Sequence, residues 1–180
     1  LKNDYKKNIL FIHDKNPRKL LSDVSNKFYK LKPDNIIAVT GTNGKTSVAN
    51  FYQQILTLNN KKVASIGTLG VLSKKIKITT NNTTIDPVST HKILQDLKKS
   101  KIENVILEAS SHGLKQHRLN NIKFKTAIFT NLSRDHLDYH KTFKDYLNSK
   151  LILFNKLVIN NGNIIFDEKI KETNQLNNIS

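Results

Sequence analysis

The sequence has 180 residues, enough for one domain with a substantial hydrophobic core and a fragment of a second. It contains no cysteine, which excludes disulfide and thiol chemistry, and no apolar run approaches the length of a membrane-spanning helix. The formal net charge of +16 would suit an anionic partner, but only three of the 30 basic residues are arginines, and the lysines are scattered among many asparagines. We therefore interpret the charge as a solvated surface that also favours a small phosphate-rich substrate, and we expect neither a nucleic-acid partner nor a membrane.

The first 34 residues predict one short strand, one helix and a break. Residues 9–12 are apolar and read as a buried strand, and Asn16-Pro17 predicts the start of a helix. The apolar face of this helix, at helical spacing, consists of Leu20, Leu21, Val24 and Phe28. We expect residues 1–34 to be the tail of a preceding domain plus a linker, and residues 35–180 to form a second, truncated domain.

A glycine-rich stretch follows an apolar run at 36–40 and precedes a helical pattern; it consists of Gly41, Thr42, Asn43, Gly44, Lys45, Thr46 and Ser47. This order indicates a strand, a tight turn and a helix N-terminus, which together present N–H groups to a phosphate. Lys45 would reach the terminal phosphates, and the Thr46 hydroxyl would help to hold Mg²⁺. The general P-loop pattern also asks for a glycine at position 39, which is Val39 here. The Gly-Lys-Thr sequence still favours a nucleotide site over a simple glycine turn.

The rest of the chain alternates short apolar strands with helical patterns. Strands are predicted at 63–67, 105–107, 126–129, 157–159 and 163–166, a hairpin at 71–80, and helices from Pro87 and over 143–154. This alternation predicts a three-layer α/β domain with a mostly parallel sheet and helices on both faces. Ligands bind at the carboxyl ends of such strands, where Gly41, Glu108 and Asn131 all fall.

Glu108 directly follows a buried apolar run and is one of four glutamates in the chain. It is either a metal ligand or the residue at which the strand reaches water, and behind a phosphate loop we favour the metal ligand. His112 and His136 follow core strands and are better ligand candidates than His13 and His91, which we interpret as surface residues.

Five motifs between about residues 34 and 165 resemble those of the Mur ligases, in the same order. They are 41–46 (Gly-Thr-Asn-Gly-Lys-Thr), 82–84 (Asn-Thr-Thr), 108–118 (from Glu108 to Arg118), 130–140 (from Thr130 to His140) and 149–150 (Ser-Lys). Within that family, the stretches at 110–114 and 134–140 resemble most closely the members that add a diamino acid. The combination of motifs is far more specific than any one of them.

The resemblance implies an ATP-dependent ligase of peptidoglycan synthesis, cytoplasmic and monomeric. ATP would phosphorylate the terminal carboxylate of UDP-MurNAc-L-Ala-D-Glu to an acyl phosphate, which the amino group of meso-diaminopimelate or L-lysine then attacks. A carboxylate and a γ-phosphate repel each other, so such a site needs Mg²⁺ and a lysine to neutralise and align them.

The resemblance also implies roles for single residues. Residues 41–47 would cradle the ATP phosphates, and Thr46 and Glu108 would bind one Mg²⁺. His136 would belong to a second Mg²⁺ site together with Lys150 as a carbamate, which gives the catalytic set Lys45, Glu108, His136 and Lys150. The UDP-linked substrate would contact Asn82, Thr83, Thr84, Ser110, Gln116 and Arg118. Without the resemblance, Lys150 reads as a solvated helix lysine, and His112, Asn131 and Asp135 fit turn or capping roles equally well.

The chain also departs from the family. We expect only the last helix and strand of the uridine-binding domain in this chain, and we expect the C-terminal domain to be missing. At 160–162, where related sequences carry an acidic pair, this chain has Asn-Asn-Gly, so the central domain is expected to stop early. The alternatives are another Mur ligase, folylpolyglutamate synthase, or a non-catalytic remnant that binds nucleotide or nothing. A nucleic-acid-binding ATPase rests on net charge alone.

Overall fold

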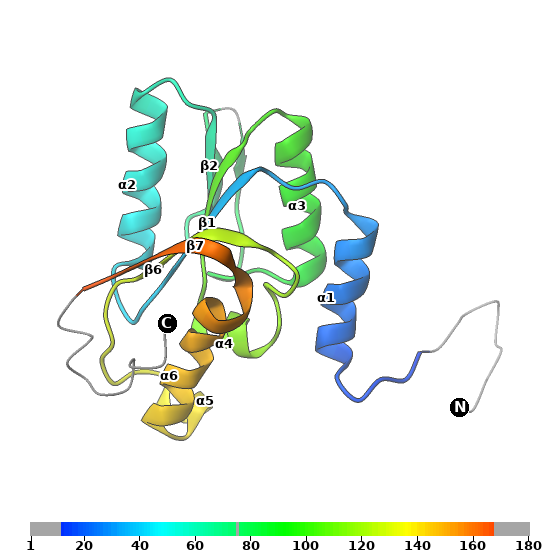
Figure 1. Ribbon diagram of the computed structural model, residues 1–180, viewed down its shortest axis with the longest axis vertical. Coiled ribbons are helices and arrows are strands. Elements are labelled where there is room, and N and C mark those ends of the chain that lie inside the picture. The colour runs from blue at the N-terminus through cyan, green and yellow to red at the C-terminus, as the bar shows by residue number, and fades with distance from the viewer. Residues whose placement is uncertain (1–11, 75, 168–180) are drawn as a thin grey trace.

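The computed structural model of the chain describes residues 12–74 and 76–167. Within this part, seven strands form one sheet in the order β4-β3-β2-β5-β1-β6-β7 (Figure 1). The strands are β1 (Asn35–Thr40), β2 (Val63–Gly67), β3 (Gly70–Ser73), β4 (Lys77–Ile78), β5 (Asn104–Glu108), β6 (Phe124–Phe129) and β7 (Val158–Phe166). The helices are α1 (Pro17–Phe28), α2 (Lys45–Leu58), α3 (Pro87–Lys99), α4 (Ser111–Lys115), α5 (Leu137–His140) and α6 (Phe143–Ile152), which runs into a π-helical turn, Leu153–Leu157.

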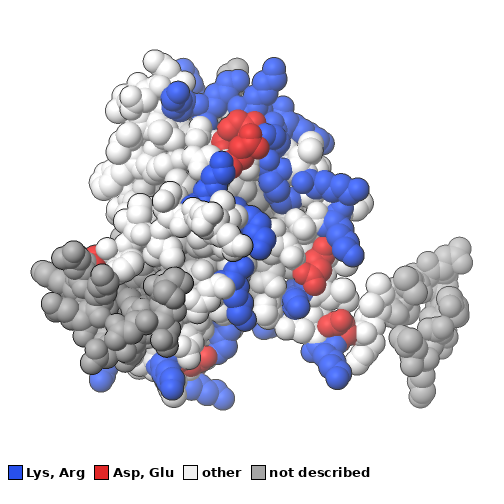
Figure 2. All heavy atoms as spheres, in the orientation of Figure 1, with Lys and Arg blue, Asp and Glu red and all other residues white. Residues whose placement is uncertain are grey.

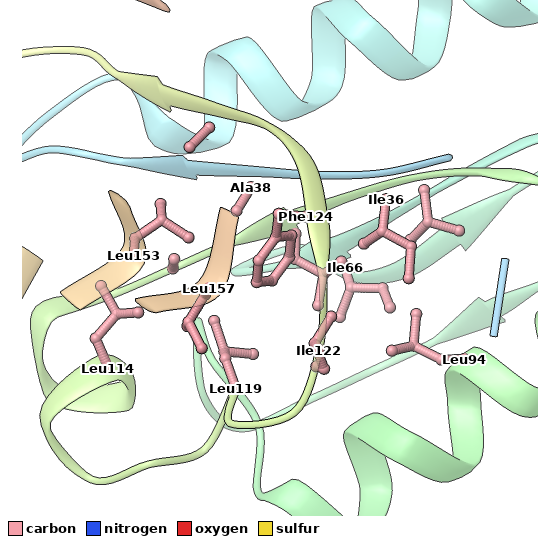
Figure 3. Close-up of a cluster of buried hydrophobic side chains, with 14 of the residues drawn as sticks. Ile36, Ala38, Ile66, Leu94, Leu114, Leu119, Ile122, Phe124, Leu153 and Leu157 are labelled. Atoms are coloured by element: carbon pink, nitrogen blue, oxygen red, sulfur yellow. The ribbon is translucent and has the colours of Figure 1, made fainter. Parts of the chain in front are cut away.

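The sheet is parallel from β2 through β5, β1 and β6 to β7, and antiparallel only in the β2–β3–β4 part. The helix α2 covers one face, where Ala49 packs on Ile37, Val39 and Ile106. The helices α3, α4 and α6 cover the other face over a larger core, in which Leu94, Leu114 and Leu153 meet side chains from the strands (Figure 3). The predicted three-layer α/β fold is therefore confirmed.

The helix α1 forms where it was predicted, but the expected apolar face is not the buried one. Asn16 caps the helix with its side chain, and Pro17 occupies the first turn. The residues that α1 buries are Ser22 and Ser25, whereas Leu21, Val24 and Phe28 are exposed. Small serines let α1 approach its neighbours closely, and Ser22 Oγ donates to Asn120 O at 3.0 Å.

The two C-terminal strands predicted around Asn161-Gly162 are in fact one strand, β7. Phe124 pairs with Val158 and Thr126 pairs with Asn163, so β7 inserts extra residues in a bulge opposite β6. Asn161 lies in this bulge with a φ of 65°. Asparagine and glycine therefore mark an irregular strand here and not a turn. Of the strand predicted at 9–12, residues 9–11 lie outside the described residues.

None of the helices in the described ranges is long and apolar enough to cross a membrane. In the view of Figure 2, basic side chains spread over the centre and right of the surface with acidic ones among them, while the surface over α2 is largely uncharged.

Candidate functional site

Three parallel strands end at one edge of the sheet and bring the polar motifs together there. The backbone ladder continues past the strands, because Ala109 N donates to Val39 O and Thr130 N donates to Thr40 O. The loop after β1 then bonds to the loop after β6, with Thr42 N at 2.9 Å from Asn131 O. The segments that begin at Gly41, Glu108 and Thr130 are therefore neighbours in space.

The loop at 41–44 has the conformation that its two glycines allow. Gly41 has a φ of 145°, and a Cβ there would lie 1.9 Å from Thr130 Oγ1. Gly44 is left-handed at the N-cap of α2, and no side chain caps this helix. The first N–H groups of α2 therefore face the loop, as a phosphate-binding turn requires. Val39 stands where the general P-loop pattern has a glycine, and it is a fully buried residue of β1. The turn therefore begins after the strand ends, at Gly41.

Asn131 and Thr130 brace this loop from β6. Asn131 Oδ1 accepts from Asn43 N at 2.9 Å, and Asn131 Nδ2 donates to Asn43 O at 3.2 Å. Thr130 Oγ1 donates to Asn43 O at 2.6 Å. The sequence left open whether Asn131 binds a ligand or stabilises a turn, and these hydrogen bonds show that it stabilises the turn at 41–44.

Glu108 is 2% exposed and lies directly beside α2. Its carboxylate accepts hydrogen bonds from Thr46 Oγ1 at 2.8 Å and from the backbone and hydroxyl of Thr68 at 3.0 and 3.2 Å. Gly67 makes room for it, since a Cβ there would lie 2.0 Å from Glu108 Oε1. Thr68 was not identified from the sequence, although a threonine just past a buried strand is a reasonable signal for this edge.

Two lysines converge on the loop from different helices. Lys45 Nζ donates to Gly41 O at 3.0 Å and to Thr42 O at 2.8 Å, and Lys150 Nζ donates to the same Gly41 O at 2.7 Å. Burial lowers the pKa of Lys45, against the opposing effect of Glu108 and Asp135. Burial, and then the charge of Lys45, lower the pKa of Lys150 to about 7.

Lys150 is 1% exposed, so the reading of it as a solvated helix lysine is wrong. The spacing of Tyr146, Lys150 and Leu153 places all three on the buried face of α6 and the turn that follows. That spacing was the signal available in the sequence. Lys150 points towards the phosphate loop.

His136 lies beside the same cluster in a left-handed conformation, with a φ of 52°. Its ring centroid is 6.2 Å from that of Tyr146, whose ring lies under Lys150 Nζ. His136 Nε2 is 3.5 Å from Asp135 Oδ2. His136 and Lys150 are thus both neighbours of one buried tyrosine that sequence reasoning missed.

The six residues predicted to bind a UDP-linked substrate lie next to this cluster, but several already have structural hydrogen bonds. Thr84 Oγ1 donates to Glu108 O and accepts from Ser110 N, while Ser110 Oγ caps α4. The hydroxyl of Thr83 contacts that of Thr68 at 3.0 Å, and Asn82 is exposed. The Thr84 hydroxyl is therefore committed to the fold in this conformation.

Arg118 and Gln116 form one unit. The guanidinium donates twice to Gln116 Oε1 and once to Thr84 O, at 2.6 Å. Gln116 Nε2 donates to Tyr139 Oη at 3.1 Å, and the His112 ring packs on Tyr139 with centroids 4.0 Å apart. Burial and the neighbouring His136 lower the pKa of His112. The unit joins the segment after α4 to α5 and to the loop before α3.

A buried polar network ties α4, α5 and α6 together behind the site. His140 Nε2 is 3.0 Å from Ser111 Oγ, and its Nδ1 is 3.3 Å from Ser149 Oγ and 3.5 Å from Asp145 Oδ2. These partners provide polar contacts for both nitrogens of the fully buried His140 ring. The network therefore fixes α4 and α5 relative to α6.

The interpretation of His91 as a surface residue is wrong. His91 is 0% exposed on α3, and burial lowers its pKa to about 4. It lies on the α1 side of the fold, against Asn120, and takes no part in the site. His13 is exposed, as expected.

The donor set fits Mg²⁺ bound together with a polyphosphate. Thr46 and Glu108 provide a hydroxyl and a buried carboxylate 2.8 Å apart, with no cationic side chain paired to the carboxylate among the described residues. The described residues hold no group of three His, Cys, Asp or Glu side chains that would suit a metal. Mg²⁺ commonly takes one or two protein oxygens and obtains the rest from phosphate and water, so this small set is sufficient.

The fold and the site together define a P-loop-type α/β domain, with its phosphate loop between β1 and α2 and a carboxylate at the end of β5. Residues 39–179 match the family description "Mur ligase middle domain". The chain therefore belongs to the Mur ligase family.

Its relatives include UDP-N-acetylmuramoyl-L-alanyl-D-glutamate–2,6-diaminopimelate ligases. The protein of this name from Brucella melitensis is 44% identical over 82% of this chain and 30% of its own length. The one from Rickettsia montanensis is 45% identical over 94% of this chain and 37% of its own length. The chain thus spans about a third of the curated relatives that it matches.

A solved ligase of the same name superposes with a TM-score of 0.71 at 32% identity, over 89% of this chain and 33% of that one. The MurF ligase of Thermotoga maritima, solved with ADP, has a TM-score of 0.65 at 18% identity, over 96% of this chain and 37% of that one. The second likeness shows the fold only.

Proposed function

We propose that the chain is the nucleotide-binding central part of an ATP-dependent ligase that joins a diamino acid to UDP-MurNAc-L-Ala-D-Glu in peptidoglycan synthesis. The observation that carries this proposal is that the phosphate loop, the Thr46–Glu108 pair and Lys150 meet at the edge of the sheet where the parallel strands end. The names of the 44–45% identical relatives supply the substrate class, and diaminopimelate is the diamino acid that they print.

The residues fit a reaction in which two anions must approach each other. The N–H groups at the start of α2 and the ammonium of Lys45 would bind the phosphates of ATP. When bound between Thr46 and Glu108, Mg²⁺ would neutralise phosphate charge and favour attack by the substrate carboxylate. Thr46 and Glu108 already lie in hydrogen-bond contact, so the chain holds these two oxygens in place beforehand.

His136 and Lys150 are proposed to act on the carboxylate side of the γ-phosphate. A lysine with a pKa of about 7 is partly neutral at neutral pH, and the neutral amine is the form that reacts with CO₂ to give a carbamate. As a carbamate, Lys150 would present oxygens to a second Mg²⁺ together with His136. As an ammonium, it would bind the phosphate oxygens directly.

The substrate side is proposed to be the wall formed by Asn82, Thr83, Thr84, Ser110, Gln116 and Arg118. Because Arg118 and Gln116 are joined to each other, they would meet the substrate as one preformed unit. The side chains in this wall that are exposed or partly exposed, such as Asn82 and Arg118, have the freedom to bind an anionic ligand.

Folylpolyglutamate synthase, a different Mur ligase and a non-catalytic remnant remain the competing functions. Solved structures of the folate enzymes match the fold at 14–20% identity, against 32% for the diaminopimelate ligase. This difference favours the diaminopimelate ligase. The intact Thr46–Glu108 pair argues against a long-decayed remnant.

The test begins with nucleotide binding by this chain. We expect calorimetric titration with ATP to show binding that requires Mg²⁺ and is lost in Lys45→Met and strongly weakened in Glu108→Gln. Lys61→Met, at an exposed lysine just beyond the C-terminal end of α2, is the matched control and should bind as the wild type does. Equal binding by Lys45→Met would contradict the proposed phosphate loop.

The substrate is tested in a whole ligase. Residues 34–165 of this chain would replace the matching segment of the Rickettsia montanensis relative, and product mass would be followed with UDP-MurNAc-L-Ala-D-Glu and diaminopimelate. We expect tripeptide formation that is abolished by Lys45→Met. A folded chimera that hydrolyses or binds ATP but makes no product would overturn the substrate assignment.

A further inference from the structure

Tyr146 is a large polar side chain that no part of the proposed reaction uses, yet it lies at the centre of the site. It is 0% exposed and lies on α6 one helical turn before Lys150. Its hydroxyl and its ring contact two different parts of the site. A tyrosine that only filled space would not need its hydroxyl.

The hydroxyl of Tyr146 reaches the phosphate loop. Tyr146 Oη is 3.0 Å from Thr42 Oγ1. Thr42 Oγ1 in turn accepts from Ser133 N at 3.0 Å and can donate to Ser133 O at 3.3 Å. If Tyr146 donates to Thr42, each of these polar groups is satisfied, and none of them is unpaired among the described residues. Thr42 is thereby fixed from α6 and from the loop after β6.

The ring of Tyr146 reaches Lys150. Lys150 Nζ lies 4.4 Å from the ring centroid and donates to Gly41 O. No carboxylate pairs with Lys150 in the described part of the chain, and Lys45 Nζ contacts the same Gly41 oxygen. The electron-rich face of the ring therefore provides the second favourable contact for a buried amino group that lies near another cation.

We propose that Tyr146 is a positioning residue of this site: its hydroxyl fixes the phosphate loop through Thr42, and its ring holds the Lys150 amino group against the same loop. The proposal rests on the assignment of residues 41–47 as the nucleotide loop. It assigns Tyr146 no contact with substrate.

The hydroxyl is tested with Tyr146→Phe, which keeps the ring. We expect the amides of residues 42–44 to exchange with solvent about 5- to 10-fold faster, as for the loss of one internal hydrogen bond, while β1 and β5 exchange as before. In a Thr42→Val background the same change should add nothing, because the partner is already gone. The matched control is Tyr52→Phe, which removes a hydroxyl on α2 that accepts from Asn35 Nδ2 of β1.

The ring is tested by the magnetic signature of Lys150. An amino group over an aromatic face has its Cε and Nζ proton signals shifted upfield, and we expect this shift in the wild type and in Tyr146→Phe but not in Tyr146→Leu. Lys45, which contacts the same carbonyl oxygen, is the internal reference. Should Tyr146→Leu fail to fold, the wild-type shift itself decides the question.

Two results would overturn the proposal: loop amides that exchange at the wild-type rate in Tyr146→Phe, or Lys150 signals without an upfield shift in the wild type. Neither measurement needs nucleotide. A wild-type chain that does not bind Mg·ATP would therefore contradict the proposed function while leaving the role of Tyr146 decided by these data. If nucleotide binds, Tyr146→Phe should raise its Kd about 5- to 10-fold.

Discussion

At the scale of single residues, His91 makes the fold sensitive to acid. Its ring is fully buried, with Nε2 3.2 Å from Asn120 O and Nδ1 without a partner among the described residues. Burial lowers its pKa from the ordinary 6.5 to about 4. Between these values the unfolded chain binds a proton that the folded chain refuses, so the free energy of unfolding falls as the pH falls.

We therefore predict that His91→Gln reduces the acid sensitivity of the fold. Urea unfolding at pH 7 and pH 5 should show the wild type losing about 2 kcal/mol more than the variant, whose side chain does not titrate. His13→Gln, at an exposed histidine, should lose as much as the wild type. Equal losses in His91→Gln and the wild type would show that His91 does not titrate in this way.

Lys150 acts in the same direction as His91 but over a more alkaline pH range, because its lowered pKa of about 7 is compared with 10.5 in the unfolded chain. The unfolded state binds more protons between pH 7 and 10.5, so the penalty is full below pH 7 and disappears as the pH rises to 10.5. Such a free-energy penalty for burying a charged amino group is typical of a residue retained for function.

We predict that Lys150→Met raises the free energy of unfolding at pH 7 by roughly 1–3 kcal/mol and removes this dependence above pH 7. The same variant should bind Mg·ATP more weakly. Lys61→Met, at an exposed lysine, should change neither quantity. A destabilised Lys150→Met would show that the bond to Gly41 O outweighs the cost of burial.

At the scale of the elements, α1 shows how tertiary packing can reverse the reading of a helix. Its spacing of Leu21, Val24 and Phe28 is regular, but the neighbours α3 and the loop at Asn120 accept the serine side instead. The polar contacts are specific: Ser22 Oγ reaches Asn120 O, and Asn121 Nδ2 reaches Asp23 Oδ1 at 2.6 Å. The amphipathic pattern correctly predicted a helix, but it did not predict which side of that helix would be buried.

A matched pair of variants on α1 tests this orientation. Leu21→Ser, at an exposed position, should change the free energy of unfolding of this chain by less than about 0.5 kcal/mol. Ser22→Leu, at a buried position, should cost about 1–3 kcal/mol because the close contact with the loop at Asn120 has no room for the added atoms. The reverse order of these effects in urea unfolding would mean that the apolar face is the buried one.

At the scale of the whole molecule, the chain holds the proposed phosphate and metal groups on one open edge of the sheet. It spans about a third of the relatives that it matches. In the proposed reaction an acyl phosphate would have to be kept from water, and two substrates would have to be oriented against ATP, which can be worth several orders of magnitude in rate. One edge of one domain provides little of that enclosure.

We therefore predict weak Mg·ATP binding and no measurable ligation by residues 1–180 on their own. The purified chain would be incubated with ATP, Mg²⁺, UDP-MurNAc-L-Ala-D-Glu and either diaminopimelate or L-lysine, and phosphate release and product mass would be followed. The chimeric ligase described above is the positive control. Robust tripeptide formation by the chain itself would contradict this prediction.

Several features of this protein follow from local sequence. The phosphate loop could be predicted because Gly41 and Gly44 have backbone conformations that few other residues adopt, and Lys45-Thr46 follow at once. Glu108 and Asn131 could be placed at the same edge because parallel strands end together. The layers of the fold follow from the alternation of apolar strands and helices.

Other features were decided only when distant segments packed. The burial of Lys150, the contact of Tyr146 with Thr42 and the burial of His91 each depend on partners about 30 to 110 residues away. The bulge in β7 depends on its register against β6, which no property of Asn161-Gly162 determines. Local propensity sets which elements form, but the side of a helix that is buried and the cost of a buried charge are set by whatever packs against it.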